Sequence, residues 1–204
     1  MKRFCEGRVF MHSEELTAAS DAELIVAALA GDTEAFDVLV LRYRRAMLTV
    51  AQQIVRNPSD AEDVVQDALL LAFEGLPQLD NLNRFGAWLH TITRNRAVRH
   101  FKNTSRYAPQ EDMEPYVNRV TDPSDADPAV IYERKQARQD VRDAIMELPA
   151  EFQEVLQLYY WAEMPQKRMA EFLSVPLTTV KWRLHKAKAL LRTLLEQRGY
   201  GDDV

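Results

Sequence analysis

The last part of the chain contains a stretch whose apolar residues can be buried together only if it forms a helix with one side packed against other helices. At helical spacing Val180, Leu184 and Leu191 share one face, and most other positions are cationic or hydrogen-bonding. Between Met164 and Arg198 eight lysines and arginines stand against two acidic residues, a net charge of +6. An amphipathic helix with this surface must bury its stripe on other helices, and its cationic side is typical of a helix that reads DNA.

The residues before this helix predict a helix-turn-helix. Pro165 interrupts the preceding helix, a short helix follows from Gln166 to Leu173, and a turn at Ser174-Val175 leads into the long one. Ser174 stands where such turns favour glycine, so a positive φ there would strain the backbone. The alternative is an ordinary helical hairpin with a solvated cationic face. Trp182 points away from the apolar stripe, which favours contact with DNA bases or packing on the stem of Lys186.

Helical periodicity runs through most of the 204 residues, and no strand-like alternation competes with it. The predicted fold class is therefore all-α, with two small helical domains joined by a flexible acidic linker. The linker combines six acidic residues with four prolines. The predicted segments are an N-terminal extension (1–19), a first domain (20–104), the linker (105–130) and a second domain (131–204).

Local signals divide the first domain into four helices. Ser20 and Glu23 form a capping-box pattern, and Gly31 supplies a helix stop. Asn57-Pro58 is expected to end the second helix, and Ser59 to cap the third through a second capping box. In that third helix we expect Leu71 to point inward with Val64, Val65, Ala68 and Ala72, which leaves an acidic exposed side.

Composition excludes several classes of function. Cys5 is the only cysteine, so no disulfide can form within the chain and a reducing, cytoplasmic location is expected. No apolar run is long enough to span a bilayer, so no membrane insertion is expected. The four histidines lie at no ligand spacing, and no paired catalytic carboxylates, nucleophile constellation or phosphate-binding glycine loop stands out. We therefore predict no metal, no cofactor and no enzymatic activity.

Two charged surfaces of the first domain are ambiguous on their own. The acidic residues between Asp60 and Glu74 fit either a protein-binding face or a solvated helix side. The cations between Arg94 and Lys102 fit either phosphate binding or a helix end that favours positive charge. Trp88 is expected in the core. Because the whole chain carries a net charge of −5 despite its cationic end, a second, basic partner is expected for its acidic part.

Three ordered stretches resemble the sigma-70 family, in particular its compact extracytoplasmic-function (ECF) members. Residues 60–73 look like the family's helix that binds core RNA polymerase, and residues 85–95 look like its promoter-melting helix. Leu148-Pro149 followed by residues 175–188 is similar to its domain-four helix-turn-helix. The chain departs from the family at Arg99, where Asp is frequent, and at residues 168–170, where Arg-Met-Ala replaces the frequent Glu-Ile-Ala. Trp182 replaces a residue that is commonly small.

The resemblance implies that the chain recruits RNA polymerase and recognises and melts promoters. The implied partners are the clamp helices of the largest polymerase subunit, the flap of the second-largest subunit, and double-stranded and melted promoter DNA. An anti-sigma factor is a further candidate partner. The implied contacts with the core polymerase are Asp60, Glu62, Asp63, Gln66 and Asp67. Those with the minus-10 element are Asp80, Asn81, Asn83, Arg84, Arg94, Asn95, Arg96, Arg99 and Lys102, and those with the minus-35 element are Thr178, Thr179, Lys181, Trp182, Arg183, His185 and Lys186.

Two other classes compete with this interpretation. A dimeric helix-turn-helix regulator that is independent of core polymerase would use the N-terminal helices for dimerisation, and would favour an apolar patch where the sequence predicts acids. A small helical enzyme would require a polar pocket, for which the sequence offers no candidate.

Overall fold

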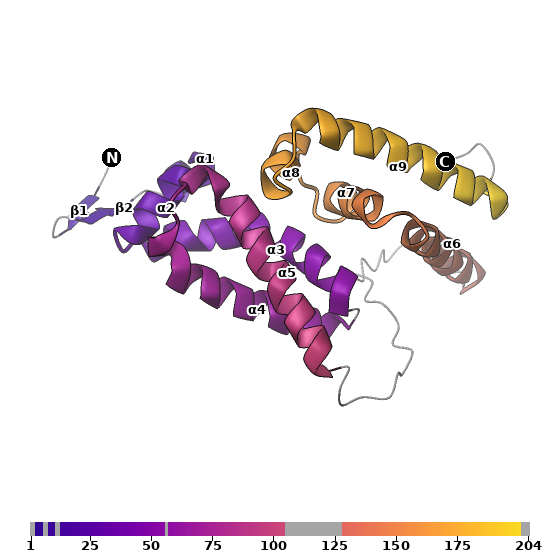
Figure 1. Cartoon of the computed structure of the whole chain (residues 1–204), viewed down its shortest axis with the longest axis horizontal. Helices are drawn as coiled ribbons and strands as arrows, with labels where there is room; N and C mark the ends of the chain where they lie inside the picture. Colours follow the sequence, from indigo (N-terminus) through magenta and orange to yellow (C-terminus); the bar gives the residue numbers. More distant parts are fainter. Residues whose placement is uncertain (1–2, 6–7, 11–12, 56, 105–127, 201–204) are drawn as a thin grey trace.

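The computed structural model describes residues 3–5, 8–10, 13–55, 57–104 and 128–200, and its side chains from residue 16 to 104 (except 56) and from 136 to 200. Two helical domains follow one another along the chain (Figure 1). The elements are β1 (Arg3–Cys5), β2 (Arg8–Phe10), α1 (Ser13–Ala18), α2 (Asp21–Leu29), α3 (Thr33–Val55), α4 (Pro58–Gly75), η1 (Leu76–Gln78), η2 (Leu82–Arg84), α5 (Phe85–Thr104), α6 (Pro128–Met146), α7 (Ala150–Tyr160), α8 (Gln166–Phe172) and α9 (Leu177–Gln197). The predicted all-α class with two helical domains is confirmed.

The N-terminal segment, predicted as an extension outside the first domain, contains regular structure. β1 and β2 pair antiparallel, and α1 follows them before the predicted start of the first domain at residue 20. Leu16 of α1 is buried against the first domain. A six-residue helix with a single buried leucine is too short to show helical periodicity, so the sequence pattern missed it.

The predicted boundaries of α2 are confirmed. The Ser20 hydroxyl accepts a hydrogen bond from the Glu23 N–H (3.3 Å), and the Glu23 carboxylate accepts one from the Ser20 N–H (2.8 Å). The Ser20 hydroxyl also lies 2.7 Å from the Glu23 carboxylate and donates a hydrogen bond to it. This bond and the one from the Ser20 N–H lower the pKa of Glu23, because they favour its charged form. Gly31 follows the helix with φ of +97°, a conformation that favours glycine.

The predicted cap of α4 is wrong by two residues. The helix begins at Pro58, and the Asn57 side chain accepts hydrogen bonds from the N–H groups of Ser59 (2.8 Å) and Asp60 (3.4 Å). Proline is well suited to the first helical position, since it lacks only an N–H that would have no partner there. The Asn-Pro pair therefore starts a helix here, whereas the sequence interpretation used it only as a stop.

The first domain is a bundle in which α3, α4 and α5 pack on one another, with α2 across α3. The apolar stripe of α3 is buried, including Phe36, Leu39, Tyr43 and Met47. Trp88 packs against this core, as expected. No helix in the described part of the chain is both long and apolar enough to cross a bilayer.

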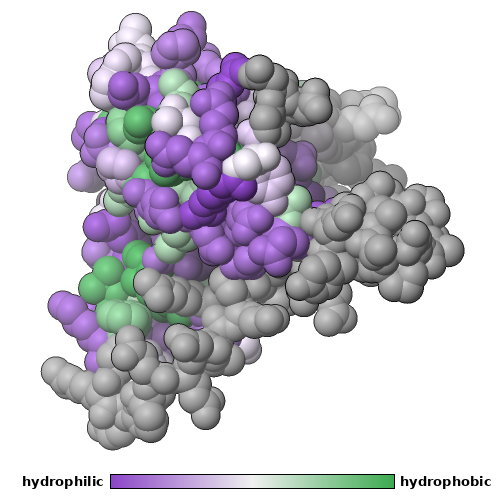
Figure 2. All heavy atoms as spheres, turned by 90° about the vertical axis from the view of Figure 1, so that its right-hand side faces the viewer, coloured by the Kyte–Doolittle hydropathy of each residue, from purple (hydrophilic) through white to green (hydrophobic). Residues whose placement is uncertain are grey.

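In the second domain, α7 and α8 pack on α9, and α6 lies along the end of α9. Tyr200 donates a hydrogen bond to Asp140 of α6 (2.6 Å), which lowers the pKa of that carboxyl group. Arg198 pairs with Glu147 (2.7 Å). Figure 2 looks at the side of the molecule where α6 and the end of α9 lie; its coloured surface is mostly hydrophilic, with hydrophobic side chains in small groups.

The two domains pack against each other. α8 lies on α5, and α7 lies on α3. The buried apolar side chains form one continuous cluster that runs from Leu16 in the first domain to Ala187 in the second. The sequence predicted a tether between two domains and gave no signal for this contact.

The turn of the helix-turn-helix carries the backbone strain that the sequence predicted. Ser174 has φ of +55°, in the region that favours glycine. Its side chain is exposed, so only the conformation of the backbone is at stake. We predict that Ser174→Gly raises the free energy of unfolding by about 0.5–1 kcal/mol, because the strain that it removes exceeds the entropy that glycine adds to the unfolded chain.

Chemical denaturation followed by circular dichroism measures this change. Ser174→Ala is the matched control, because it removes the hydroxyl and keeps the strained Cβ. Equal stability of the two variants would contradict the explanation.

Candidate functional site

The acidic side of α4 is partly neutralised within the protein. Glu62 pairs with Arg44 of α3 (2.5 Å), Asp67 pairs with Arg96 of α5, and Asp60 lies 3.5 Å from the Nε2 atom of His100. Exposed pairs of this kind contribute little stability, but they fix the direction of the side chains.

Two of the five predicted polymerase contacts face solvent more fully. The side chains of Asp63 and Gln66 are exposed, one turn of α4 apart. Of the predicted set, these two are the best placed to meet a partner directly. They are flanked by Glu62 and Asp67, which pair with arginines, and by Asp60 beside His100.

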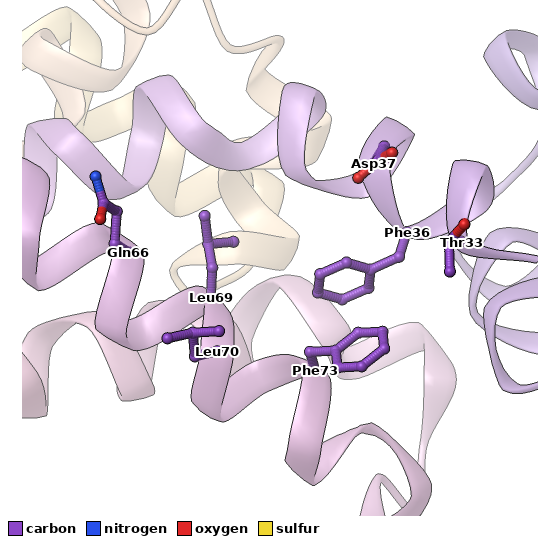
Figure 3. A pocket seen from close by; sticks show the side chains of 7 residues that line it. All are labelled: Thr33, Phe36, Asp37, Gln66, Leu69, Leu70 and Phe73. Atoms are coloured by element: carbon purple, nitrogen blue, oxygen red, sulfur yellow. The ribbon is translucent and has the colours of Figure 1, made fainter.

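An apolar pocket of about 480 Å³ adjoins this acidic side (Figure 3). It lies between α3 and α4, and Gln66 belongs to both its rim and the acidic side. Phe36 and Phe73 meet edge to face with ring centroids 5.0 Å apart. The residues that line the pocket are Thr33, Phe36, Asp37, Gln66, Leu69, Leu70 and Phe73.

Sequence reasoning missed the apolar part of this surface. Leu70 is 62% exposed and Phe73 50% exposed, and Leu71, which was expected to point inward, is 43% exposed. The run Ala68-Leu-Leu-Leu-Ala-Phe73 is apolar around the whole helix, whereas the core takes only one stripe. These additional apolar residues, more than the core can bury, were the sequence signal for a second contact face. The acidic side is therefore no evidence by itself against a dimeric regulator, because an apolar patch lies beside it.

The predicted minus-10 residues form two groups, one in the segment before α5 and one along the second half of that helix. Asp80, Asn81, Asn83 and Arg84 are exposed in the segment before the helix. The Asn81 side chain accepts a hydrogen bond from the Asn83 N–H (3.0 Å) and so shapes that segment. Arg94, Asn95, Arg99 and Lys102 are exposed farther along α5, while Arg96 is half-buried against Asp67. About 27 Å of helix separates Arg84 from Lys102.

The predicted minus-35 residues share the outer side of α9. Val180, Leu184 and Ala187 are buried, as the stripe predicted. Arg183 and Thr179 are half-buried. The exposed members of the predicted set are Thr178, Lys181, Trp182, His185 and Lys186.

Trp182 has a packing partner that the sequence did not suggest. Its indole is 57% exposed and lies 5.9 Å from the ring of Phe152 on α7. One side of the indole thus rests on the protein while the rest remains open to a ligand.

Comparison with known proteins identifies two family matches along the chain. Residues 39–107 match sigma-70 region 2, and residues 138–191 match sigma-70 region 4. The chain is 32% identical over 178 residues to the ECF RNA polymerase sigma factor SigM of Mycobacterium tuberculosis, covering 86% of this chain and 85% of SigM. It is also 32% identical over 192 residues to a probable RNA polymerase sigma factor, RfaY, of Xanthomonas campestris, covering 92% of this chain but spanning only 47% of RfaY.

Among solved structures, that of CnrH in complex with the cytosolic domain of CnrY is similar, with a TM-score of 0.55 and 25% identity. The match covers 87% of this chain and 97% of CnrH. The chain belongs to the sigma-70 family of RNA polymerase sigma factors, and its relatives include ECF members.

Proposed function

We propose that this chain binds core RNA polymerase, directs it to promoters through their minus-10 and minus-35 elements, and assists in melting them. The observation that carries the proposal is the combination, in one chain, of an exposed cationic helix-turn-helix face and an acidic face on a separate domain. Its place of work is the cytoplasm, where polymerase and chromosome meet, and its role involves no covalent chemistry. Family membership favours this function over the dimeric regulator.

The proposed polymerase surface combines charge with apolar area. Asp63 and Gln66 offer exposed polar contacts, and Leu70 and Phe73 offer exposed apolar ones beside them. A basic, amphipathic partner surface, such as the clamp helices of the largest subunit, would satisfy both. The flap of the second-largest subunit is the proposed contact of the second domain.

The proposed promoter surfaces are the segment from Asp80 to Arg84, the exposed cations of α5, and the outer side of α9. Cations supply affinity through phosphates, and the side chains of α9 supply sequence discrimination in the major groove. The relative CnrH was solved with another protein bound to it. This observation supports the prediction that an anti-sigma factor binds this chain.

The polymerase contact is tested by charge reversal at one exposed position. Asp63→Arg should leave the fold intact and weaken binding to core polymerase by about 2 kcal/mol, because the new cation repels a basic partner. Titration of labelled core polymerase with the variant measures the loss.

Glu34→Arg is the matched control, since it makes the same charge change at an exposed position of the neighbouring helix α3 outside the named contact residues. Asp63→Arg is preferred to a reversal at Asp67, which would also break the pair with Arg96. Equal binding by the two folded variants would refute the proposed polymerase surface.

Promoter reading is tested on the complex with core polymerase. Lys186→Ala should weaken binding to all duplexes alike and lower the slope of affinity against salt concentration by about one, as expected for a lost phosphate contact. Trp182→Ala should lose affinity mainly on the cognate minus-35 duplex, because an apolar ring at base edges is sensitive to the base present.

Fluorescence anisotropy on cognate and scrambled minus-35 duplexes at several salt concentrations separates the two effects. Trp182→Phe, which keeps an aromatic ring against Phe152, controls for lost packing. An equal loss on both duplexes for Trp182→Ala would show that the indole serves packing alone.

A further inference from the structure

An aromatic pair joins the last helix of the helix-turn-helix to α7, which packs on it (Figure 1). The ring centroids of Trp182 on α9 and Phe152 on α7 lie 5.9 Å apart, and the two ring planes are tilted by 56°. This separation is within the range in which aromatic rings attract each other. Phe152 is buried, whereas more than half of Trp182 is exposed. The buried ring is therefore a fixed support for a side chain that is otherwise open to solvent.

Trp182 stands at the border between the outer and the packed sides of α9. Thr178 and His185, each about one helical turn from it, are exposed. Thr179 and Arg183, which also neighbour it, are half-buried. The indole thus rests on the protein along one side, and along the other it adjoins residues that we propose to face the major groove.

Support by Phe152 restricts the orientation of the indole. An exposed tryptophan on a helix can turn about two side-chain bonds, and binding in one orientation loses the entropy of the others. The contact with Phe152 favours one orientation before DNA is bound. A ring held in this way discriminates between base pairs, because moving aside to accept a different base would break the contact with Phe152.

The chemistry of the indole determines which base edge it can distinguish. Its single polar group is the Nε1–H donor. Every base pair presents an acceptor in the major groove, so this donor alone discriminates poorly. The apolar ring is more selective, because only thymine carries a methyl group there. Cytosine presents an amino group instead, and that group would lose its hydrogen bond to water against the ring.

We propose that Trp182, held in place by Phe152, recognises the methyl group of one thymine in the minus-35 element. Phe152 is a positioning residue, which acts on DNA only through the indole. The exposed cations Lys181 and Lys186 lie near Trp182 on α9 and are suited to hold the phosphates beside that base. The proposal rests on the proposed function and names the base that this part of α9 selects.

The test uses the full chain in complex with core polymerase. Duplexes are first selected by binding to this complex from a pool randomised over the minus-35 element. Each thymine of a selected duplex, on both strands, is then replaced singly by deoxyuridine, which removes only the methyl group. At one position the complex should lose affinity about fourfold, as expected when one buried methyl group is removed. Fluorescence anisotropy measures the two affinities.

The tryptophan is tested by its removal. The complex that contains Trp182→Ala should bind the thymine and deoxyuridine duplexes equally at that position. Trp161→Ala is the matched control, because it removes another exposed indole from the same domain, at the end of α7 and outside the proposed promoter surface. This control should keep the preference for thymine.

The positioning role is tested by Phe152→Leu, which keeps an apolar side chain at the buried position and removes the ring. This variant should bind the thymine duplex less selectively against the deoxyuridine duplex, while the dependence of affinity on salt concentration stays unchanged. A purely structural role would instead weaken binding to both duplexes equally. Because Trp182 is exposed, its variants test the thymine contact even if Phe152→Leu fails to fold.

Selected duplexes that share no thymine, or equal sensitivity to deoxyuridine in the native and Trp182→Ala complexes, would overturn the proposal. An unchanged preference in folded Phe152→Leu would overturn the positioning role. Failure of the native complex to prefer the selected duplexes over scrambled ones would instead refute the proposed function.

Discussion

The packing of both domains depends on the Tyr43 side chain. Its ring meets Phe85 edge to face at 5.6 Å inside the first domain and stacks on Phe172 of the second. Gly86 lets α5 approach α3 closely, since a Cβ there would lie 3.0 Å from the Tyr43 hydroxyl oxygen. That hydroxyl is held by Asp21 and has little room to move. One aromatic residue therefore couples the bundle to the docked second domain.

Much of the fold could be predicted because its signals are local. The apolar stripes of α3 and α9 repeat at helical spacing, and the residues on them are buried. The capping box at Ser20 and the strained φ at Ser174 follow from the chemistry of one or two residues. Most of the predicted site residues on α9 are exposed for the same reason, since a helix with one buried stripe turns the rest of its surface outward.

What could not be predicted depends on contacts between distant residues. The short α1 is anchored by one buried leucine, and the exposure of Leu71 reflects which side of α4 the core happens to cover. The docking of α8 on α5 joins surfaces that look like ordinary core positions in each domain. The Asp67–Arg96 pair links residues that the sequence divided between two partners. Periodicity shows that a face is apolar or charged, but not which other face it meets.

The Asp67–Arg96 pair also shows how opposite charges coexist in one small domain. α4 turns acidic and α5 turns basic side chains toward their common border, where Asp67 meets Arg96 and Asp60 lies near the imidazole of His100. At this border opposite charges lie next to each other, which weakens the electric field that they project into solvent. Beyond it, Asp63 on one helix and Arg94 on the other remain exposed. The domain thus presents two faces of opposite sign side by side, and it can attract a basic protein surface and a polyanion at the same time because neither field is cancelled where it is exposed.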